Sequence, residues 1–419
     1  MPVRVSIEQV NSYTAYKQHL TPARRGSDVV SVVRSVGPLR ATPAIVPYIS
    51  FWARMTDLHP NQVEAALYRD RSLVRIPAMQ AKLYAIPTAD LPAYYQATKP
   101  SLQQGLQSYV DDILGEAESS PAQPDMGDQT ELIHRVMEVL NTRGPRTVDE
   151  LAELLPALDQ LVPYDPDLPE LGGSRLGSRL IPALCAQGLL IRAQTRGGWR
   201  SGQYSYAALS AWLPGLDLEK LSPEQALERV IWAYIAAFGP VTVGDVSHWL
   251  GSIPRQQIVT AMRKLDNRLA HLQVTDHAGD YLLAAEELDD LLHHVPPQRY
   301  ANLLPPRDSY PTAYSDTCRF LATYHRDRIW DQAGEALGTV WVDGRVCGTW
   351  WYQLREERIV VRFFEMVGAE AIALVGEEAR RLGEFLEFSS LDVDISHYLD
   401  QDMDDEESGM TFAYVSLKP

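Results

Sequence analysis

Two stretches of the chain repeat the same succession of helical and strand-like patterns. In each stretch an amphipathic helix, over 132–140 and then over 226–235, precedes a Gly-Pro-x-Thr-Val phrase that starts at Gly144 and again at Gly239. Gly-Pro ends a helix, and the threonine that follows is a residue type that caps the start of the next one. A third helical run and two strand-like runs around a glycine-containing turn complete both stretches. Three helices and a β-hairpin predict a winged helix in each.

A third, weaker copy of this order occupies the N-terminal region. A helix is predicted where Gly37-Pro38 closes an apolar run, and the pattern favours two more helices before two strand-like runs. We therefore expect three tandem winged helices. The predicted helices cover 29–36, 44–55 and 61–69, and the predicted strands cover 73–76 and 82–86.

The C-terminal part of the chain has a different periodicity. A β-hairpin is predicted over 339–350, because its Asp343-Gly344 pair suits a type I′ turn. A strand over 358–364, an amphipathic helix over 369–386 and an alternating strand over 391–395 follow. The predicted fold class is α+β, with three tandem winged-helix (helix-turn-helix plus β-wing) domains followed by a C-terminal mixed α/β, barrel-like domain. The predicted parts are winged helix 1 over 1–115, a linker over 116–129, winged helix 2 over 130–213, winged helix 3 over 214–295 and a C-terminal β-rich domain over 296–419.

Composition places the chain among ordinary globular proteins, with 419 residues of which 45% are hydrophobic and 22% charged. No apolar run approaches the roughly 18 residues of a membrane span, and the start lacks the apolar run of a signal peptide. We therefore expect a cytoplasmic protein without a membrane partner. Three scattered cysteines argue against a disulfide framework or a cysteine metal site, and the acidic run 400–407 is interpreted as a solvated loop. We expect neither metal nor cofactor.

Charge is unevenly distributed along the chain. The net charge is −17, yet residues 1–100 hold 12 basic and 6 acidic groups (+6), whereas residues 301–419 hold 11 basic and 22 acidic groups (−11). An acid-free stretch over 171–216 also carries five arginines. Basic groups segregated in this way indicate a face for a polyanion, although solvated surface arginines are the alternative interpretation.

Several phrases in the second half of the chain resemble a known family. They are Leu303-Leu304-Pro305-Pro306-Arg307-Asp308-Ser309-Tyr310 and Val340-Trp341-Val342-Asp343-Gly344-Arg345-Val346-x-Gly348-Thr349-Trp350, supported by Trp249-Leu250-Gly251 and His325-Arg326. The chain resembles the winged-helix DNA-binding family of AlkZ-like and YcaQ-like DNA glycosylases. The resemblance implies tandem winged helices and a β domain that form a basic channel for duplex DNA. It also implies hydrolysis of the N-glycosidic bond of alkylated or cross-linked purines without a metal or cofactor.

The catalytic signature of that family is altered in this sequence. The family places Gln-apolar-Gln or Gln-apolar-Asp after a leucine and ahead of the second helix, where this chain has Leu39-Arg40-Ala41-Thr42-Pro43. Arg40 and Thr42 therefore occupy the two catalytic positions. Base excision builds positive charge on the sugar, which a guanidinium opposes, and no acid lies nearby in sequence to act as a general base. We expect base excision to be weakened, altered or lost.

The predicted partner is double-stranded DNA, bound by a monomer. Arginines of the first two modules are expected to contact phosphates, and Trp199, at a wing tip, could lie against DNA. Lys82 is interpreted as an exposed strand lysine facing phosphate rather than as a Schiff-base nucleophile. The expected phosphate contacts are Arg24, Arg25, Arg34, Arg54, Lys82, Arg175, Arg179, Arg192, Arg196 and Arg200.

Three other functions remain open from the sequence. An active monofunctional glycosylase could use other residues to activate water. A transcriptional regulator is another possibility, since winged helices often bind operators, but three tandem copies do not supply the two-fold symmetry of a palindromic site. A scaffold that binds no DNA is favoured by the net charge of −17.

Overall fold

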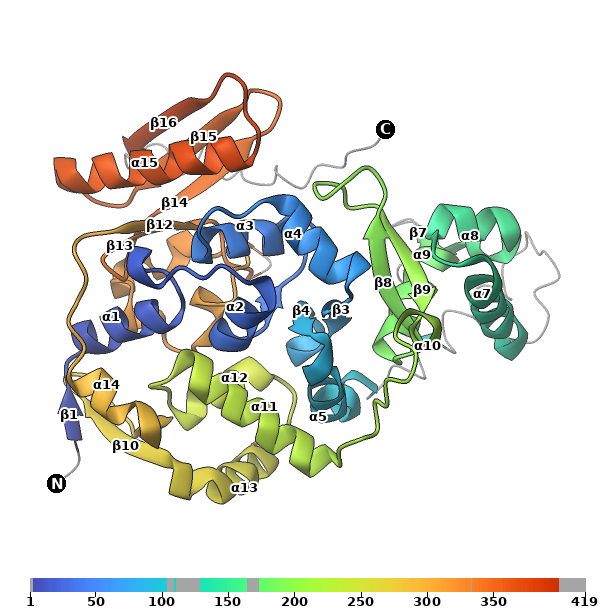
Figure 1. Ribbon diagram of the computed structural model, residues 1–419, viewed down its shortest axis with the longest axis horizontal. Helices are drawn as coiled ribbons and strands as arrows, with labels where there is room; N and C mark the ends of the chain where they lie inside the picture. The colour runs from blue at the N-terminus through green and yellow to red at the C-terminus, as the bar shows by residue number, and fades with distance from the viewer. Residues whose placement is uncertain (1–2, 104–108, 111–128, 164–172, 333, 399–419) are drawn as a thin grey trace. The chain divides into compact units, whose positions relative to one another are not determined.

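The computed structural model describes residues 3–103, 109–110, 129–163, 173–332 and 334–398. Most of the predicted linker, 116–129, and the acidic run 400–407 lie outside these residues. Contacts divide the chain into two units. One joins Met1–Val63 with Ile231–Pro419, and the other is Glu64–Val230 (Figure 1). The finer domain boundaries expected from the sequence stay a prediction.

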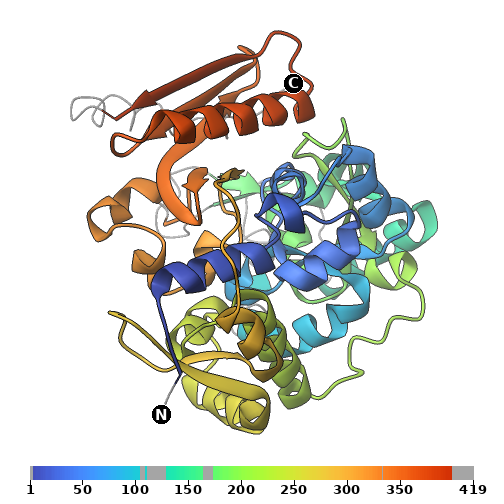
Figure 2. The same cartoon turned by 60° about the vertical axis from the view of Figure 1, so that its left-hand side comes forward.

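A five-stranded sheet forms the C-terminal part of the first unit. The strand order is β12-β13-β14-β15-β16, antiparallel except for the parallel pair β15–β16, whose connection is helix α15 (Figure 2). The predicted hairpin is confirmed, with positive φ angles of 50° at Asp343 and 78° at Gly344. Because β12 and β16 are both edges of this sheet, the expectation of a barrel-like domain is wrong for the described strands. The elements are β12 (Ala301–Leu304), β13 (Thr339–Val342), β14 (Arg345–Gln353), β15 (Arg358–Phe363), α15 (Ala369–Phe385) and β16 (Asp392–His397).

The rest of the first unit is mainly helical. Its N-terminal strand β1 pairs in parallel with β10, so Val3 lies beside Leu272 in a three-stranded sheet with β11. The sequence patterns did not indicate β1 or the helix α1 that follows. These elements are β1 (Val3–Val5), α1 (Ile7–Lys17), α2 (Val29–Val36), β2 (Leu39–Arg40), α3 (Val46–Arg54), α4 (Pro60–Glu64), α11 (Pro223–Phe238), α12 (Val243–Leu250), α13 (Arg255–Leu265), β10 (Leu269–Val274), β11 (Tyr281–Ala284) and α14 (Leu288–Leu292), of which α4 and α11 cross the unit boundaries.

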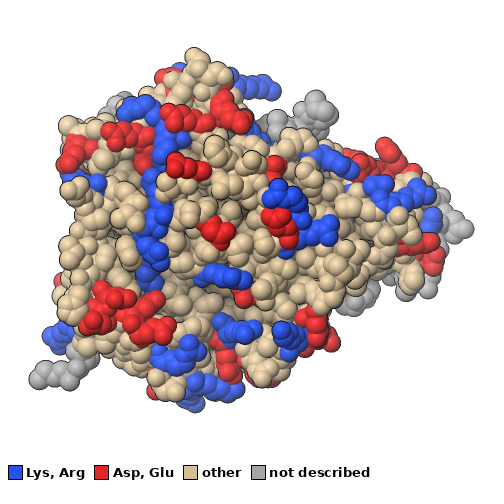
Figure 3. Space-filling model, in the orientation of Figure 1, with Lys and Arg blue, Asp and Glu red and all other residues tan. Residues whose placement is uncertain are grey.

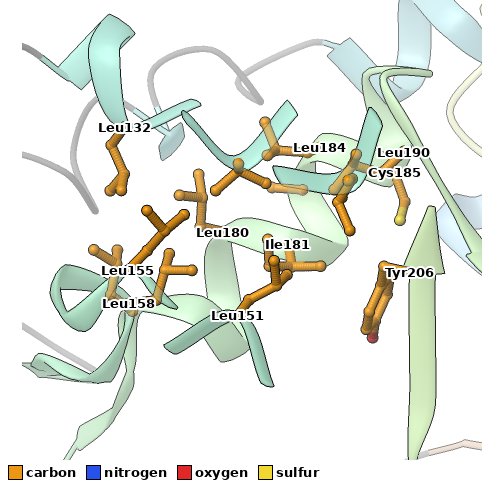
Figure 4. Packing of buried hydrophobic residues seen from close by; sticks show 14 of the residues in the cluster. Leu132, Leu151, Leu155, Leu158, Leu180, Ile181, Leu184, Cys185, Leu190 and Tyr206 are labelled. Carbon is orange, nitrogen blue, oxygen red and sulfur yellow. The ribbon is translucent and has the colours of Figure 1, made fainter. Parts of the chain in front are cut away.

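The second unit is built around a leucine-rich core between α7, α8 and α9. Leu132, Leu151, Leu180 and Leu184 are each at most 2% exposed, and Figure 4 shows their side chains converging. The unit contains a π-helical turn (Ala65–Arg69), β3 (Leu73–Pro77), β4 (Leu83–Pro87), α5 (Leu91–Gln103), α7 (Gln129–Arg143), β5 (Arg146–Thr147), α8 (Val148–Leu154), β6 (Leu161–Pro163), β7 (Gly173–Arg175), α9 (Leu176–Ala186), β8 (Leu190–Thr195), β9 (Tyr204–Ala208) and α10 (Leu209–Trp212).

The repeated Gly-Pro-x-Thr-Val phrase has the same local structure in both places. Thr147 caps α8 and Thr242 caps α12, each in a capping box with the acid three residues later, Glu150 or Asp245. The helices α11, α12 and α13 precede the hairpin β10–β11 as predicted, and α7, α8 and α9 precede β8–β9. The antiparallel pair β6–β7 lies between α8 and α9, where the sequence predicts only a turn. None of the described helices is long and apolar enough to cross a membrane.

Removing the Thr147 cap is expected to increase fraying of the first turn of α8. In Thr147→Ala, the Glu150 N–H loses an acceptor at 3.1 Å, which costs about 1 kcal/mol. Hydrogen exchange over 148–154 should become about fivefold faster. The control is Thr142→Ala, which removes a hydroxyl that donates to the Glu138 carbonyl oxygen inside α7. Equal exchange over 148–154 in the two variants would contradict the capping role.

Candidate active-site region

The segment that connects α2 to α3 in the first unit carries Arg40 and Thr42, the two positions at which the sequence predicts an altered catalytic motif. α2 begins at the cap residue Asp28, whose carboxylate accepts the Ser31 N–H at 2.8 Å, and ends at Gly37. Gly37 has φ of 86°, and a Cβ there would lie 2.9 Å from the Phe238 ring, so a side chain is excluded on both grounds. Arg40 follows in the short strand β2, and Thr42 precedes Pro43. The backbone of this segment is therefore confined at its start.

Ser309, from the loop after β12, fixes the same segment by two hydrogen bonds. Its hydroxyl accepts the Arg40 N–H at 2.9 Å and donates to the Pro38 carbonyl oxygen at 2.7 Å. Ser309 is buried, so both bonds replace water at otherwise unsatisfied backbone groups. The Leu-Leu-Pro-Pro-Arg-Asp-Ser-Tyr phrase thus holds the altered motif although the two are about 270 residues apart in sequence.

Asp308, one residue earlier, anchors helix α3 from inside the protein. Its carboxylate accepts a bidentate pair of N–H groups from Arg54 at 2.7 and 2.9 Å, and the Ser50 hydroxyl at 2.7 Å. The Tyr310 N–H, at 2.9 Å, completes its set of donors. Arg54 and Asp308 are each 0% exposed. The phosphate contact expected of Arg54 is therefore wrong, because its guanidinium is fully buried and bound to a carboxylate.

Arg40 is paired with a carboxylate that the sequence patterns did not indicate. Its guanidinium donates to Glu335 at 3.2 and 3.3 Å, and its side chain is only 4% exposed. Arg307 approaches the same carboxylate at 3.9 Å, and the Glu335 N–H donates to Asp331 at 2.8 Å. No motif marks Glu335, which lies 295 residues from Arg40. Thr42, by contrast, is half-buried.

This arrangement brings an acid to the altered motif but places it between cations. A carboxylate that assists base excision must stabilise positive charge on the sugar or orient a water. The Glu335 carboxylate instead accepts hydrogen bonds from Arg40 and lies close to Arg307. The sequence-based expectation that no acid stands near Arg40 holds for the linear sequence only.

The remaining N-terminal arginines have different surroundings. Arg24 is exposed with its guanidinium 5.5 Å from the Tyr16 ring, and Arg34 is exposed on α2. Arg25 is largely buried and bound to Glu378 at 2.9 Å. Figure 3 shows basic side chains interspersed with acidic ones on the face that it displays. Arg24 and Arg34 keep the exposure that a phosphate contact needs, whereas Arg25 is neutralised by an acid.

Two of the five arginines in the acid-free stretch, Arg175 and Arg196, are paired with acids from outside that stretch. Arg175 binds Asp149 at 2.7 Å and Asp159 at 3.3 Å, and Arg196 binds Glu150 at 3.0 Å. Burial alone would raise the pKa of Glu150, but the Thr147 N–H and Arg196 lower that pKa below its usual value. The net positive charge around these five arginines is therefore lower than the linear sequence indicates.

The other basic residues of the second unit contact aromatic groups or lie at the hairpin. Arg192 lies 4.9 Å from the Tyr204 ring, and Arg179 donates to the Tyr109 hydroxyl at 3.3 Å. Arg200 lies 4.8 Å from the Trp199 ring, and both are half-buried near the tip of the β8–β9 hairpin. Lys82 is half-buried just before β4.

The predicted contact residues fall into both units. Arg24, Arg25, Arg34 and Arg40 belong to the unit that contains the N-terminus, and the five arginines over 175–200 belong to the other, as does Lys82. A common cradle for DNA stays a prediction. The described residues include no group of three or more His, Cys, Asp and Glu side chains that could hold a metal ion.

Comparisons with known proteins connect these features to one family. A sequence model of DNA glycosylases described as AlkZ-like matches residues 33–385. A search of curated proteins finds no match. Among solved structures, the Streptomyces sahachiroi DNA glycosylase AlkZ is similar, with a TM-score of 0.72 and 22% sequence identity over 94% of this chain and 100% of that chain. The mixed α+β fold of this protein therefore resembles that of AlkZ.

The buried Arg54–Asp308 pair yields a prediction of stability. Asp308→Asn leaves the buried guanidinium without its countercharge, and losing one partner of such a pair typically costs about 3–5 kcal/mol. The free energy of unfolding, measured by guanidinium denaturation with tryptophan fluorescence, should fall by about that amount. Asp327→Asn, at an exposed position, is the control. The interpretation is wrong if the two variants unfold at the same denaturant concentration.

Proposed function

Because the chain belongs to the AlkZ-like DNA glycosylase family, we propose that it is a monomeric, cytoplasmic protein that binds double-stranded DNA in DNA repair but does not excise bases through the two family motif positions. The recurring order of three helices and a hairpin supports three tandem winged helices as the DNA-binding framework. Exposed arginines in both units support contacts to phosphate. The proposed activity requires no cofactor.

One observation carries the loss of excision: Arg40 is buried against Glu335. A sugar that loses its base gains positive charge, so a guanidinium in place of the family's first amide raises the energy of that transition state. Glu335 offsets the charge of Arg40, and in doing so its own oxygens are occupied by guanidinium N–H groups. Thr42 has a hydroxyl but neither the amide nor the carboxylate that the family places there.

Glycosylase activity is tested directly with duplexes that contain N7-methylguanine or N3-methyladenine. The protein is incubated with each duplex, and alkaline cleavage then reveals abasic sites. We expect cleavage at background level, together with a gel shift of the same duplexes by the full chain. Heat-depurinated duplex serves as the positive control for the cleavage step. Strand breaks above background with the wild-type protein would contradict the proposed loss of excision.

An active glycosylase is the second candidate function, and the position of Glu335 beside the motif is the observation that favours it. Glu335 is a described carboxylate that contacts the motif residue Arg40. If strand breaks occur, Glu335→Gln should abolish them. Thr42→Ala then tests whether the Thr42 hydroxyl also contributes to the cleavage. Asp331→Asn is a control for general disturbance of the neighbouring loop, because Asp331 accepts the Glu335 N–H.

DNA binding itself is tested by reversing three charges of the second unit. Arg192→Glu, Arg196→Glu and Arg200→Glu together should weaken duplex binding and lower the salt slope by about one for each phosphate that the protein no longer neutralises. Fluorescence anisotropy over a salt series measures both quantities. The matched control reverses Arg135, Arg143 and Arg229, which are exposed and belong to the same unit. Equal affinity of the two triple variants would remove the hairpin arginines from the proposed interface.

A further inference from the structure

Helix α13 in the first unit has one buried side and one exposed polar side. Its buried side consists of Ile258, Ala261, Met262 and Leu265. On a helix of 3.6 residues per turn, Gln256, Thr260 and Arg263 form one row at the centre of the opposite side. Arg255 and Lys264 flank this row to either side, and all five residues are exposed.

The exposed face of α13 contains basic, amide and hydroxyl groups but no acid. The first carboxylate after the helix is Asp266, beyond its last residue. Within the described part of the chain, neither Arg255 nor Arg263 forms an ion pair. The helix therefore presents positive charge and the donors of Gln256 and Arg263 to solvent, while the Thr260 hydroxyl donates to the Gln256 carbonyl oxygen at 2.8 Å.

The chemistry of these side chains fits nucleic acid better than protein. A protein interface is anchored by apolar or aromatic side chains, which are missing from the central row of α13. Arg pairs with guanine and Gln with adenine through the acceptors and donors that these bases expose in the major groove. Arg255 and Lys264, on the two flanks, have the charge and length that backbone phosphates attract.

In the third helix–hairpin copy, α13 is better suited to contact DNA than the adjacent β10–β11 hairpin. The β10–β11 turn contains Asp276 and Asp280, and Asp280 binds His271 at 2.7 Å, so the hairpin presents acids. With 11 residues, α13 is about 16 Å long. The diameter of an α-helix with its side chains matches the width of the major groove of B-DNA, which admits one α-helix.

We propose that α13 lies in the major groove of the bound duplex, with Gln256, Thr260 and Arg263 contacting base edges and Arg255 contacting phosphate. This inference rests on the proposed binding of double-stranded DNA. It adds a surface from the third helix–hairpin copy, for which the sequence patterns indicated no contact, and it gives the protein a preference for certain bases.

Modified purines test the major-groove contact without changing the backbone. The full-length protein is titrated with a duplex of mixed sequence and with the same duplex containing 7-deazaguanine and 7-deazaadenine, which lack the N7 acceptor of the major groove. Wild-type affinity should fall at least fivefold on the modified duplex, and Gln256→Ala/Arg263→Gln should bind both duplexes with the same, reduced affinity. Equal wild-type affinity for the two duplexes would overturn the inference.

Charge-matched variants separate this contact from general electrostatics. Arg255→Gln/Arg263→Gln is compared with Arg326→Gln/Arg355→Gln, which removes two exposed arginines elsewhere in the same unit. The α13 variant should bind duplex at least fivefold more weakly than the control variant at physiological salt. If the wild type binds but the two variants bind equally, α13 is not at the interface. If the wild type does not bind duplex even at low salt, the proposed function itself fails.

Discussion

The buried ion pair between Arg54 and Asp308 fixes helix α3, which directly follows the segment that carries Arg40 and Thr42. Asp308 holds α3 through Arg54 and Ser50, and its neighbour Ser309 holds the backbone on either side of Leu39. A fully buried pair is only tolerated when its remaining donors and acceptors are satisfied, and here the Tyr310 N–H contributes to that requirement. The Leu-Leu-Pro-Pro-Arg-Asp-Ser-Tyr phrase therefore acts as a support for the segment that carries Arg40, and not as a separate chemical site.

Arg40 and Glu335 show how a buried guanidinium is accommodated in the segment between α2 and α3. A lone guanidinium at 4% exposure would be strongly destabilising, and a carboxylate from a distant loop compensates it. Nη2 of Arg40 donates to both oxygens of that carboxylate, at 3.3 and 3.2 Å. Under the proposed function, this position serves the electrostatic balance of the folded state rather than the stabilisation of a cationic sugar.

The sequence predicted well the structures that depend on a few neighbouring residues. The Asp343-Gly344 turn, the α15 helix and the order of elements after the second Gly-Pro phrase depend on local backbone preferences, and all are confirmed. Pairings between distant segments were missed: β1 with β10, Arg54 with Asp308, and Arg40 with Glu335. The five arginines over 175–200 illustrate the same limit, because α8 supplies the carboxylates that the acid-free stretch lacks. Proximity in space has no local signal in a single sequence.

The division of the chain has a consequence for its synthesis. Strand β1 pairs with residues 272–274, so this strand leaves the ribosome before its partner, which emerges on the order of tens of seconds later. Glu64–Val230, in contrast, is contiguous and holds its own leucine core. This contiguous segment can fold before residues 272–274 are translated, whereas the unit that contains β1 is completed only after them.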